Sequence, residues 1–163
     1  MRLSKFYDGL LVGCGVASAA AIFTIVVLVS INVMLRKFFQ FSIPWTIEVS
    51  EYALYFSTFI AAPWALAKNA HIRVDLLANA LTGQASVLLE RATNVIGFLV
   101  SIVFLVYGIV STYDSWSNNA MIFKELIIAE WLLLAIIPIS AFLLSVEFIR
   151  RLLRAVSEHE EKI

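Results

Sequence analysis

The chain has very few of the residues that build catalytic or redox centres. Among its 163 residues are one cysteine, Cys14, and two histidines, His71 and His159. A single cysteine excludes an internal disulfide, a cysteine-based zinc site and a dithiol redox centre. Both histidines lie in polar segments, which argues against haem held inside a helical bundle. The sequence therefore predicts no cofactor, no metal centre and no enzymatic activity.

Charge is also scarce and has no net sign. Only 15% of the residues are charged, and twelve basic residues balance twelve acidic ones. A net charge of zero gives no reason to expect nucleic acid as a partner. In contrast, 61% of the residues are hydrophobic and the mean hydropathy is +0.91. A soluble domain of this length could not bury so much apolar surface, so the composition predicts a membrane protein.

Four long apolar runs follow one another along the chain. They cover about residues 9–35, 49–67, 92–113 and 126–146. A bilayer core ~30 Å thick is crossed by ~20 helical residues, and each run is near that length or longer. The first run begins like a signal peptide but continues well past the ~7–15 apolar residues of such a segment. We therefore expect an all-α protein, a single membrane domain with four transmembrane helices.

Basic residues divide unevenly between the two ends of these helices. Nine Lys and Arg residues lie on the side of the two termini and the middle connection. Three lie on the other side, namely Arg36, Lys37 and Lys124. The positive-inside rule then places both termini in the cytoplasm.

Two segments on the cytoplasmic side are expected to lie at the membrane surface. Residues 71–82 alternate apolar and polar side chains at helical spacing, which predicts a short amphipathic helix in the interface between the second and third spans. Its polar face carries His71, Arg73 and Asp75. The tail, residues 150–163, begins with three arginines that we expect to meet the headgroups of phospholipids. These are Arg150, Arg151 and Arg154.

Small residues repeat at every fourth position along the spans. The stripes are Gly9, Gly13 and Ala17 in the first helix, Ala53, Ser57 and Ala61 in the second, and Gly97 and Ser101 in the third. Small residues at this spacing let helix backbones approach closely and drive association in lipid. Each stripe could serve packing within the bundle or contact with another protein. Because four helices carry several stripes, we expect at least one to face another protein.

Charged and aromatic residues gather at the outer start of the second helix. Glu48 and Glu51 share one helix face, and Trp45 lies just before them. The two carboxylates could do no more than interact favourably with the positive end of the helix dipole. Alternatively, they could pair with Arg36 or Lys37, or bind a partner's cations at the outer surface. No span carries a charge near its centre, which argues against an ion-coupled carrier that acts by itself.

The order of these features is similar to that of a known family. A long first helix ends in Arg36 and is followed by Pro44, Trp45, Glu48 and Glu51, then by the segment FIAAPWALAKNAHIRVDLL and a fourth helix that contains Pro138. The most specific match covers Lys68, His71, Ile72, Arg73, Val74 and Asp75. In these residues, and along nearly its whole length, the chain resembles the small integral membrane subunit, of DctQ type, of tripartite ATP-independent periplasmic (TRAP) transporters. Asn69 and Ala70 depart from the glycine that the family often shows before the histidine.

This resemblance implies a role in transport across a bacterial inner membrane. Such systems pair the four-helix subunit with a larger membrane subunit, which binds substrate and sodium, and with a periplasmic binding protein that delivers an organic acid. The small subunit would brace the large one, and Arg36, Trp45, Glu48 and Glu51 could help dock the binding protein. Two alternatives stay open, a self-contained homo-oligomeric transporter or channel and an accessory subunit of another membrane complex. The transported substrate does not follow from this chain, because specificity would lie in the other subunits.

Overall fold

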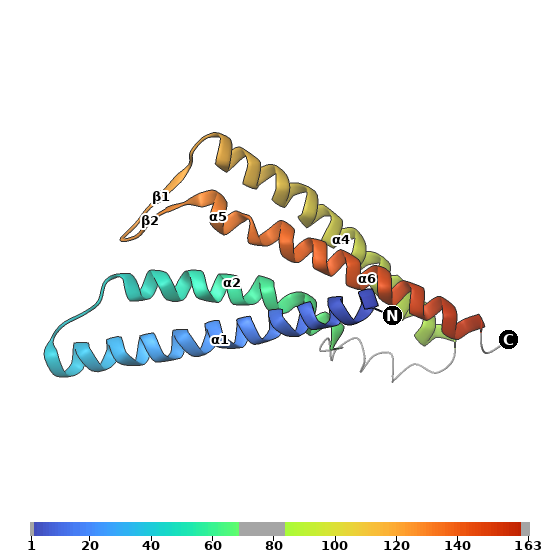
Figure 1. The fold of residues 1–163 in the computed structure, drawn as a ribbon, viewed down its shortest axis with the longest axis horizontal. Coiled ribbons are helices and arrows are strands. Elements are labelled where there is room, and N and C mark those ends of the chain that lie inside the picture. The colour runs from blue at the N-terminus through green and yellow to red at the C-terminus, as the bar shows by residue number, and fades with distance from the viewer. Residues whose placement is uncertain (1, 69–83, 161–163) are drawn as a thin grey trace.

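The computed structural model describes residues 2–68 and 84–160, which form two long helical hairpins (Figure 1). The first joins α1 (Arg2–Phe39) to α2 (Trp45–Ala67). The second joins α4 (Gln84–Ser117) to α5 (Glu130–Leu134) and α6 (Ile136–Glu160). The N-terminus and the end of α6 lie at one end of the bundle, which we call the terminal end. The connections within both hairpins lie at the opposite end, which we call the loop end (Figure 1).

Three of the four predicted spans are confirmed as helices long and apolar enough to cross a membrane. Within the described residues these are Phe6–Phe39, Arg91–Ser117 and Glu130–Leu153. The second predicted span is also a helix, the 23-residue α2, but glutamates and hydroxyl side chains dilute its apolar character. Its crossing of the membrane therefore stays a prediction. The predicted interfacial helix, with its polar residues His71, Arg73 and Asp75, lies outside the described residues.

A small antiparallel β-hairpin interrupts the helices between α4 and α5. Strand β1 (Met121–Phe123) pairs with β2 (Ile127–Ala129), and Ile122 lies opposite Ile128. The expectation of an all-α protein whose fourth span starts near residue 126 is wrong for this segment. The β-branched isoleucines favour a strand, and a short apolar run does not by itself distinguish a strand from a helix.

The ends and breaks of the helices have local causes. Just after α1, Gln40 has a φ of 53°, and just after α4, Asn119 has a φ of 49°. A residue in this left-handed region commonly ends a helix. Pro138 has no N–H to donate to the carbonyl of Leu134, and the last span is broken there into α5 and α6. Pro63 is instead contained within α2, which continues past it.

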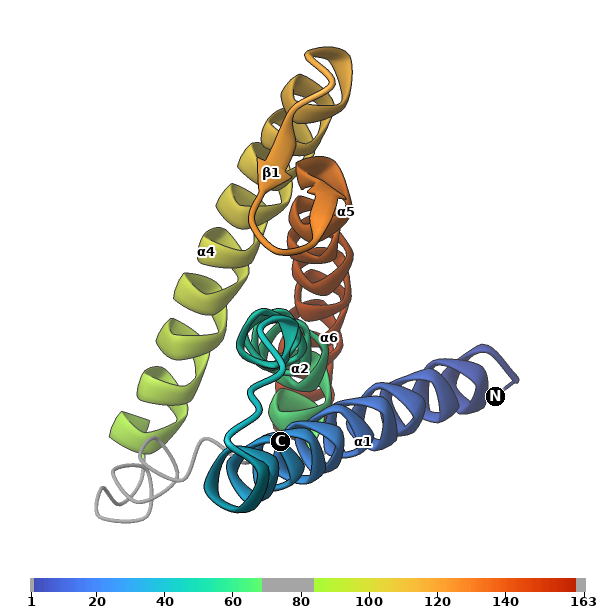
Figure 2. The same cartoon turned by 90° about the vertical axis from the view of Figure 1, so that its left-hand side faces the viewer.

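Close packing joins the two helices of the first hairpin. Leu11 and Ser18 of α1 are buried, and the hydroxyl of Ser18 donates to the carbonyl oxygen of Ser57 on α2 at 3.0 Å. A Cβ added at Gly15 would lie 2.8 Å from the ring of Trp64, so only glycine allows this approach without a shift. On its other side, α2 contacts α6, and Figure 2 shows α2 between α1 and the second hairpin.

The second hairpin is also closed by small residues. The hydroxyl of Ser145 on α6 donates to the hydroxyl of Ser101 on α4 at 3.0 Å, and both side chains are buried. A Cβ added at Gly108 would lie 3.0 Å from Cδ of Pro138, and one added at Gly97 would overlap the ring of Phe148. The small residues of α4 thus serve packing within the chain.

Candidate functional site

At the loop end a buried carboxylate joins the two hairpins. Glu48 lies in the first turn of α2 and is only 5% exposed. One of its oxygens accepts a hydrogen bond from the hydroxyl of Tyr52 at 2.7 Å, and the other accepts one from the backbone N–H of Leu126 at 2.9 Å. Because Leu126 belongs to the turn of the β-hairpin, Glu48 fastens that turn to α2. The expectation that Glu48 is available at the outer surface is therefore wrong.

The hydrogen bonds also decide the ionisation of Glu48. Burial raises the pKa of this carboxyl, but the hydrogen bonds from Tyr52 and from the backbone of the β-hairpin, together with the charge of Lys124, lower it by more. The pKa of Glu48 consequently lies below its ordinary value. A charged carboxylate is what holds the β-hairpin at neutral pH.

A second, exposed contact lies beside the buried one. Nζ of Lys124, in the turn of the β-hairpin, is 2.9 Å from a carboxylate oxygen of Glu51 and 5.8 Å from the ring centre of Tyr52. The hypothesis that Glu51 pairs with Arg36 or Lys37 is therefore wrong, because the β-hairpin supplies the cation. Arg36 remains exposed at the end of α1.

At the terminal end an arginine cluster joins the hairpins. Nη1 of Arg150 on α6 lies 2.9 Å from Asp8 of α1 and 3.2 Å from Glu147, whose side chain is buried. The guanidinium also lies 4.8 Å from the ring centre of Tyr7, whose hydroxyl donates to the carbonyl oxygen of Leu143 at 2.7 Å. These contacts fix the start of α1 against α6.

The neighbouring arginine binds the other helix of the first hairpin. Arg151 donates a hydrogen bond to the carbonyl oxygen of Leu66, near the end of α2. Both arginines therefore join helices within the chain, a role that was not visible in the sequence. Their contact with lipid headgroups stays a prediction, and the side chain of Arg154 lies outside the described part of the structure.

The predicted stripes of small residues on α1 and α2 take opposite positions. Ser57 is buried against α1, and Ala53 and Ala61, one turn to either side of it, are partly buried. On α1, in contrast, a Cβ added at Gly9 or Gly13 would have no atom within 4 Å. The α1 stripe, which continues to the exposed Ala17, thus faces open space among the described residues.

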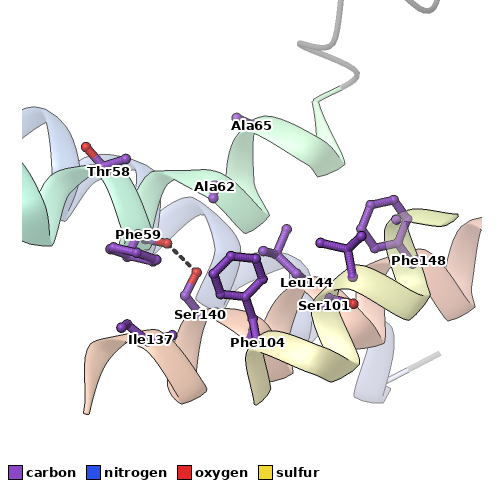
Figure 3. Close-up of a pocket in the computed structure, with 13 residues that line it drawn as sticks. Thr58, Phe59, Ala62, Ala65, Ser101, Phe104, Ile137, Ser140, Leu144 and Phe148 are labelled. Atoms are coloured by element: carbon purple, nitrogen blue, oxygen red, sulfur yellow. Dashed lines mark hydrogen bonds between the residues drawn. The ribbon is translucent and has the colours of Figure 1, made fainter. Parts of the chain in front are cut away.

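An apolar groove of about 350 Å³ opens between α2, α4 and α6 (Figure 3). Its walls carry small side chains such as Ala62 and Ala65 and larger ones such as Phe104. The hydroxyl of Ser140 donates to the carbonyl oxygen of Phe59 at 2.5 Å and links α6 to α2 beside the groove (Figure 3). Within the described residues no cluster of His, Cys, Asp and Glu side chains is suited to hold a metal ion.

The arrangement is that of two apolar hairpins, tied by polar contacts at both ends, with one glycine-bearing helix face left open. Comparison with curated proteins finds no match to this chain. The family model of tripartite ATP-independent periplasmic transporters, DctQ component, matches residues 25–158. This match covers most of the chain and agrees with the order of helices described above. The chain belongs to the DctQ family, the small membrane component of TRAP transporters.

Proposed function

We propose that this chain is a scaffold subunit, which holds the larger, substrate-binding and sodium-binding membrane subunit of a TRAP transporter during uptake of an organic acid. Membership of the DctQ family supports a place in such a complex. The observation that carries the scaffolding role is the open face of α1, on which a Cβ added at Gly9 or Gly13 would meet no other atom of residues 2–68 and 84–160.

This open face contrasts with the other glycines of the described residues. Gly15, Gly97 and Gly108 each allow a neighbouring helix to approach, so their lack of a side chain is used within the bundle. A glycine inside a helix is less favourable than alanine by about 1 kcal/mol. In the part of the chain that the structure describes, no neighbouring helix packs closely on Gly9 or Gly13, which favours their use against a helix of another protein.

The same packing supports a four-span topology. α2 contacts α1 and runs back along it to the terminal end (Figure 1). A bilayer crossed by α1 would therefore be crossed by α2 as well, despite the two glutamates near its start. The bias of basic residues places the terminal end in the cytoplasm of a bacterium and the loop end in the periplasm.

The distribution of charge favours a brace over a self-contained carrier. The charged side chains of the three candidate spans lie in the first or last turns of each span, and the buried Glu147 is paired with Arg150. Carriers commonly keep ionisable groups deep in the membrane for coupling. The periplasmic loop end, where Arg36 and Trp45 are exposed and Glu51 pairs with Lys124, would help dock the binding protein.

The proposal is tested by filling the open face. We expect Gly13→Leu to lower recovery of a co-expressed large subunit by about tenfold or more, since a loss of ~1.4 kcal/mol in close packing suffices. Substrate uptake should fall with it, while the variant still inserts in the membrane. Ala19→Leu is the matched control, because Ala19 is exposed on a different side of α1 and should leave assembly unchanged.

Two results would contradict the proposed scaffold role. One is full recovery and uptake with Gly13→Leu. The other is sodium-driven uptake by the small subunit reconstituted alone in liposomes, which would favour the self-contained carrier.

A further inference from the structure

The apolar groove has the length of one leaflet of a membrane. Along α6 its lining extends from Ile137 to Phe148, which at 1.5 Å per residue is about 16 Å. One leaflet contributes about half of the ~30 Å hydrocarbon core. The groove therefore offers a path of the right length for one lipid acyl chain that enters from the terminal end.

Basic residues lie on or just after the helices, beyond the terminal end of the groove. A basic residue follows the lining on each of its three walls, one or two helical turns beyond the last lining residue. These residues are Lys68 just after α2, Arg91 on α4 and Arg151 on α6. The hydrogen bond from Arg151 to the carbonyl oxygen of Leu66 holds one of these charges beside the end of α2.

Two hydrogen-bond donors at the same end have no acceptor among the described residues. They are Nε of Arg91 and Nδ2 of Asn94, and Asn94 is only 3% exposed. Asn94 lies one turn before Gly97, a lining residue of the groove. Buried donors are nearly always paired in folded proteins, so this end of α4 is suited to a ligand rich in acceptor oxygens.

We propose that the groove binds a phospholipid of the cytoplasmic leaflet. One acyl chain lies along the groove, and the anionic phosphate lies among Lys68, Arg91 and Arg151. Basic pockets between transmembrane helices on the cytoplasmic side are suited to anionic headgroups. An apolar helix of the large subunit would fill the groove as well but would bring no anion to Lys68 and Arg91. The inference rests on the cytoplasmic position of the terminal end given under the proposed function.

The site is tested on the full-length chain purified in detergent. Native mass spectrometry and thermal unfolding are measured with short-chain phosphatidylglycerol, with phosphatidylcholine of the same chain length, and with inorganic phosphate. We expect one tightly held phosphatidylglycerol per chain, weaker binding of phosphatidylcholine and no stabilisation by phosphate alone. Lys68→Gln and Arg91→Gln should each weaken phosphatidylglycerol binding about fivefold. Lys37→Gln, at the loop end, is the matched charge control and should leave binding unchanged.

The acyl chain is tested by filling the groove. Ala62→Phe should weaken the binding of both lipids, and Val100→Trp, at a partly exposed lining position, provides a second filled variant. Ala19→Phe on α1 is the control for added bulk. Unchanged lipid binding by both filled variants would overturn the proposal, as would equal stabilisation by phosphate alone.

The outcomes also separate this site from the scaffold role. Gly13→Leu should lose the large subunit and keep the lipid, whereas Ala62→Phe should lose the lipid and keep the large subunit. If Ala62→Phe loses the large subunit while lipid binding persists, the groove holds a partner helix. That result would overturn the lipid site and leave the scaffold intact.

Discussion

The two ends of the bundle join the same two hairpins by opposite chemistry. At the loop end the carboxylate of Glu48 accepts a backbone N–H from the β-hairpin. At the terminal end Arg150 and Arg151 donate from α6 to the carboxylate of Asp8 and to the carbonyl oxygen of Leu66. Between the ends, apolar and small residues carry the packing, and the hydroxyl of Ser140 adds one neutral hydrogen bond from α6 to α2. The charged contacts described between the hairpins thus lie at the two ends, where water or headgroups are near.

The ends also differ in how deeply their most buried ion pair lies. The side chains of Arg150 and Glu147 are 19% and 4% exposed. Those of Lys124 and Glu51 at the loop end are 46% and 60% exposed. Exposed pairs contribute little to stability because water and salt screen them, whereas removing one member of a buried pair leaves an uncompensated charge. The difference predicts that the terminal end is the more sensitive to mutation.

Arg150→Gln is expected to have the largest effect. It leaves the carboxylate of Glu147 buried without its cation and removes the contact with Asp8. Loss of one partner of a buried pair costs about 3–5 kcal/mol in the free energy of unfolding. Denaturant unfolding of the full chain in detergent micelles measures this loss.

The double variant Glu147→Gln/Arg150→Gln shows whether the buried charge is the cause. It should recover much of the stability lost by Arg150→Gln, because no unpaired charge remains. A double variant as unstable as the single one would assign the loss to other contacts of the guanidinium, such as that with Tyr7. The contrast between the two ends would then not depend on buried charge.

The long helices followed from the sequence, and their contacts did not. Three apolar runs identified the spans because a lipid environment demands about 20 apolar residues in succession. The short apolar segment before α5 was expected to be helix, yet Ile127 and Ile128 pair with β1. An apolar segment of this length is compatible with either a helix or a strand. The pairing of the two segments across the turn favours the strand.

The functional residues show the same limit. The four-residue spacing marked both Gly13 and Ser57, but spacing does not reveal which stripe meets a helix of the same chain. Glu48 was recognised as a residue of interest but expected to be exposed, because its partner is the backbone of Leu126, 78 positions away in sequence. A backbone partner leaves no signal in the sequence.

Glu48→Gln should have an intermediate effect, confined to the loop end. The amide offers only one acceptor oxygen and turns an NH₂ group toward a hydrogen-bond donor, so the β-hairpin loses its anchor. We expect hydrogen exchange at the amide of Leu126 to become about tenfold faster, as for loss of a charge-assisted hydrogen bond. Exchange at the buried backbone near Arg150 should not change.

The pH dependence of this anchor has a definite sign. Because the pKa of Glu48 is lowered in the folded chain, its contribution to stability is present above the ordinary carboxyl value of 4.5. It is lost as the pH falls through the lowered value. In the wild type, protection of the Leu126 amide from hydrogen exchange should therefore decrease as acid protonates Glu48. In Glu48→Gln no carboxylate is present at this position, so the protection should not change over the same pH range.

Lys124→Gln should have the smallest effect, because it breaks only the exposed pair with Glu51. Such pairs contribute about 0–1 kcal/mol and are screened by salt, so the difference from the wild type should shrink further at high ionic strength. Lys37→Gln, at an exposed cation of the same end, is the matched control. Lys124 also lowers the pKa of Glu48, so the acid transition at Leu126 should move slightly toward neutral pH in Lys124→Gln. A loss of Leu126 protection as large as in Glu48→Gln would mean that the exposed pair, and not the buried carboxylate, holds the β-hairpin.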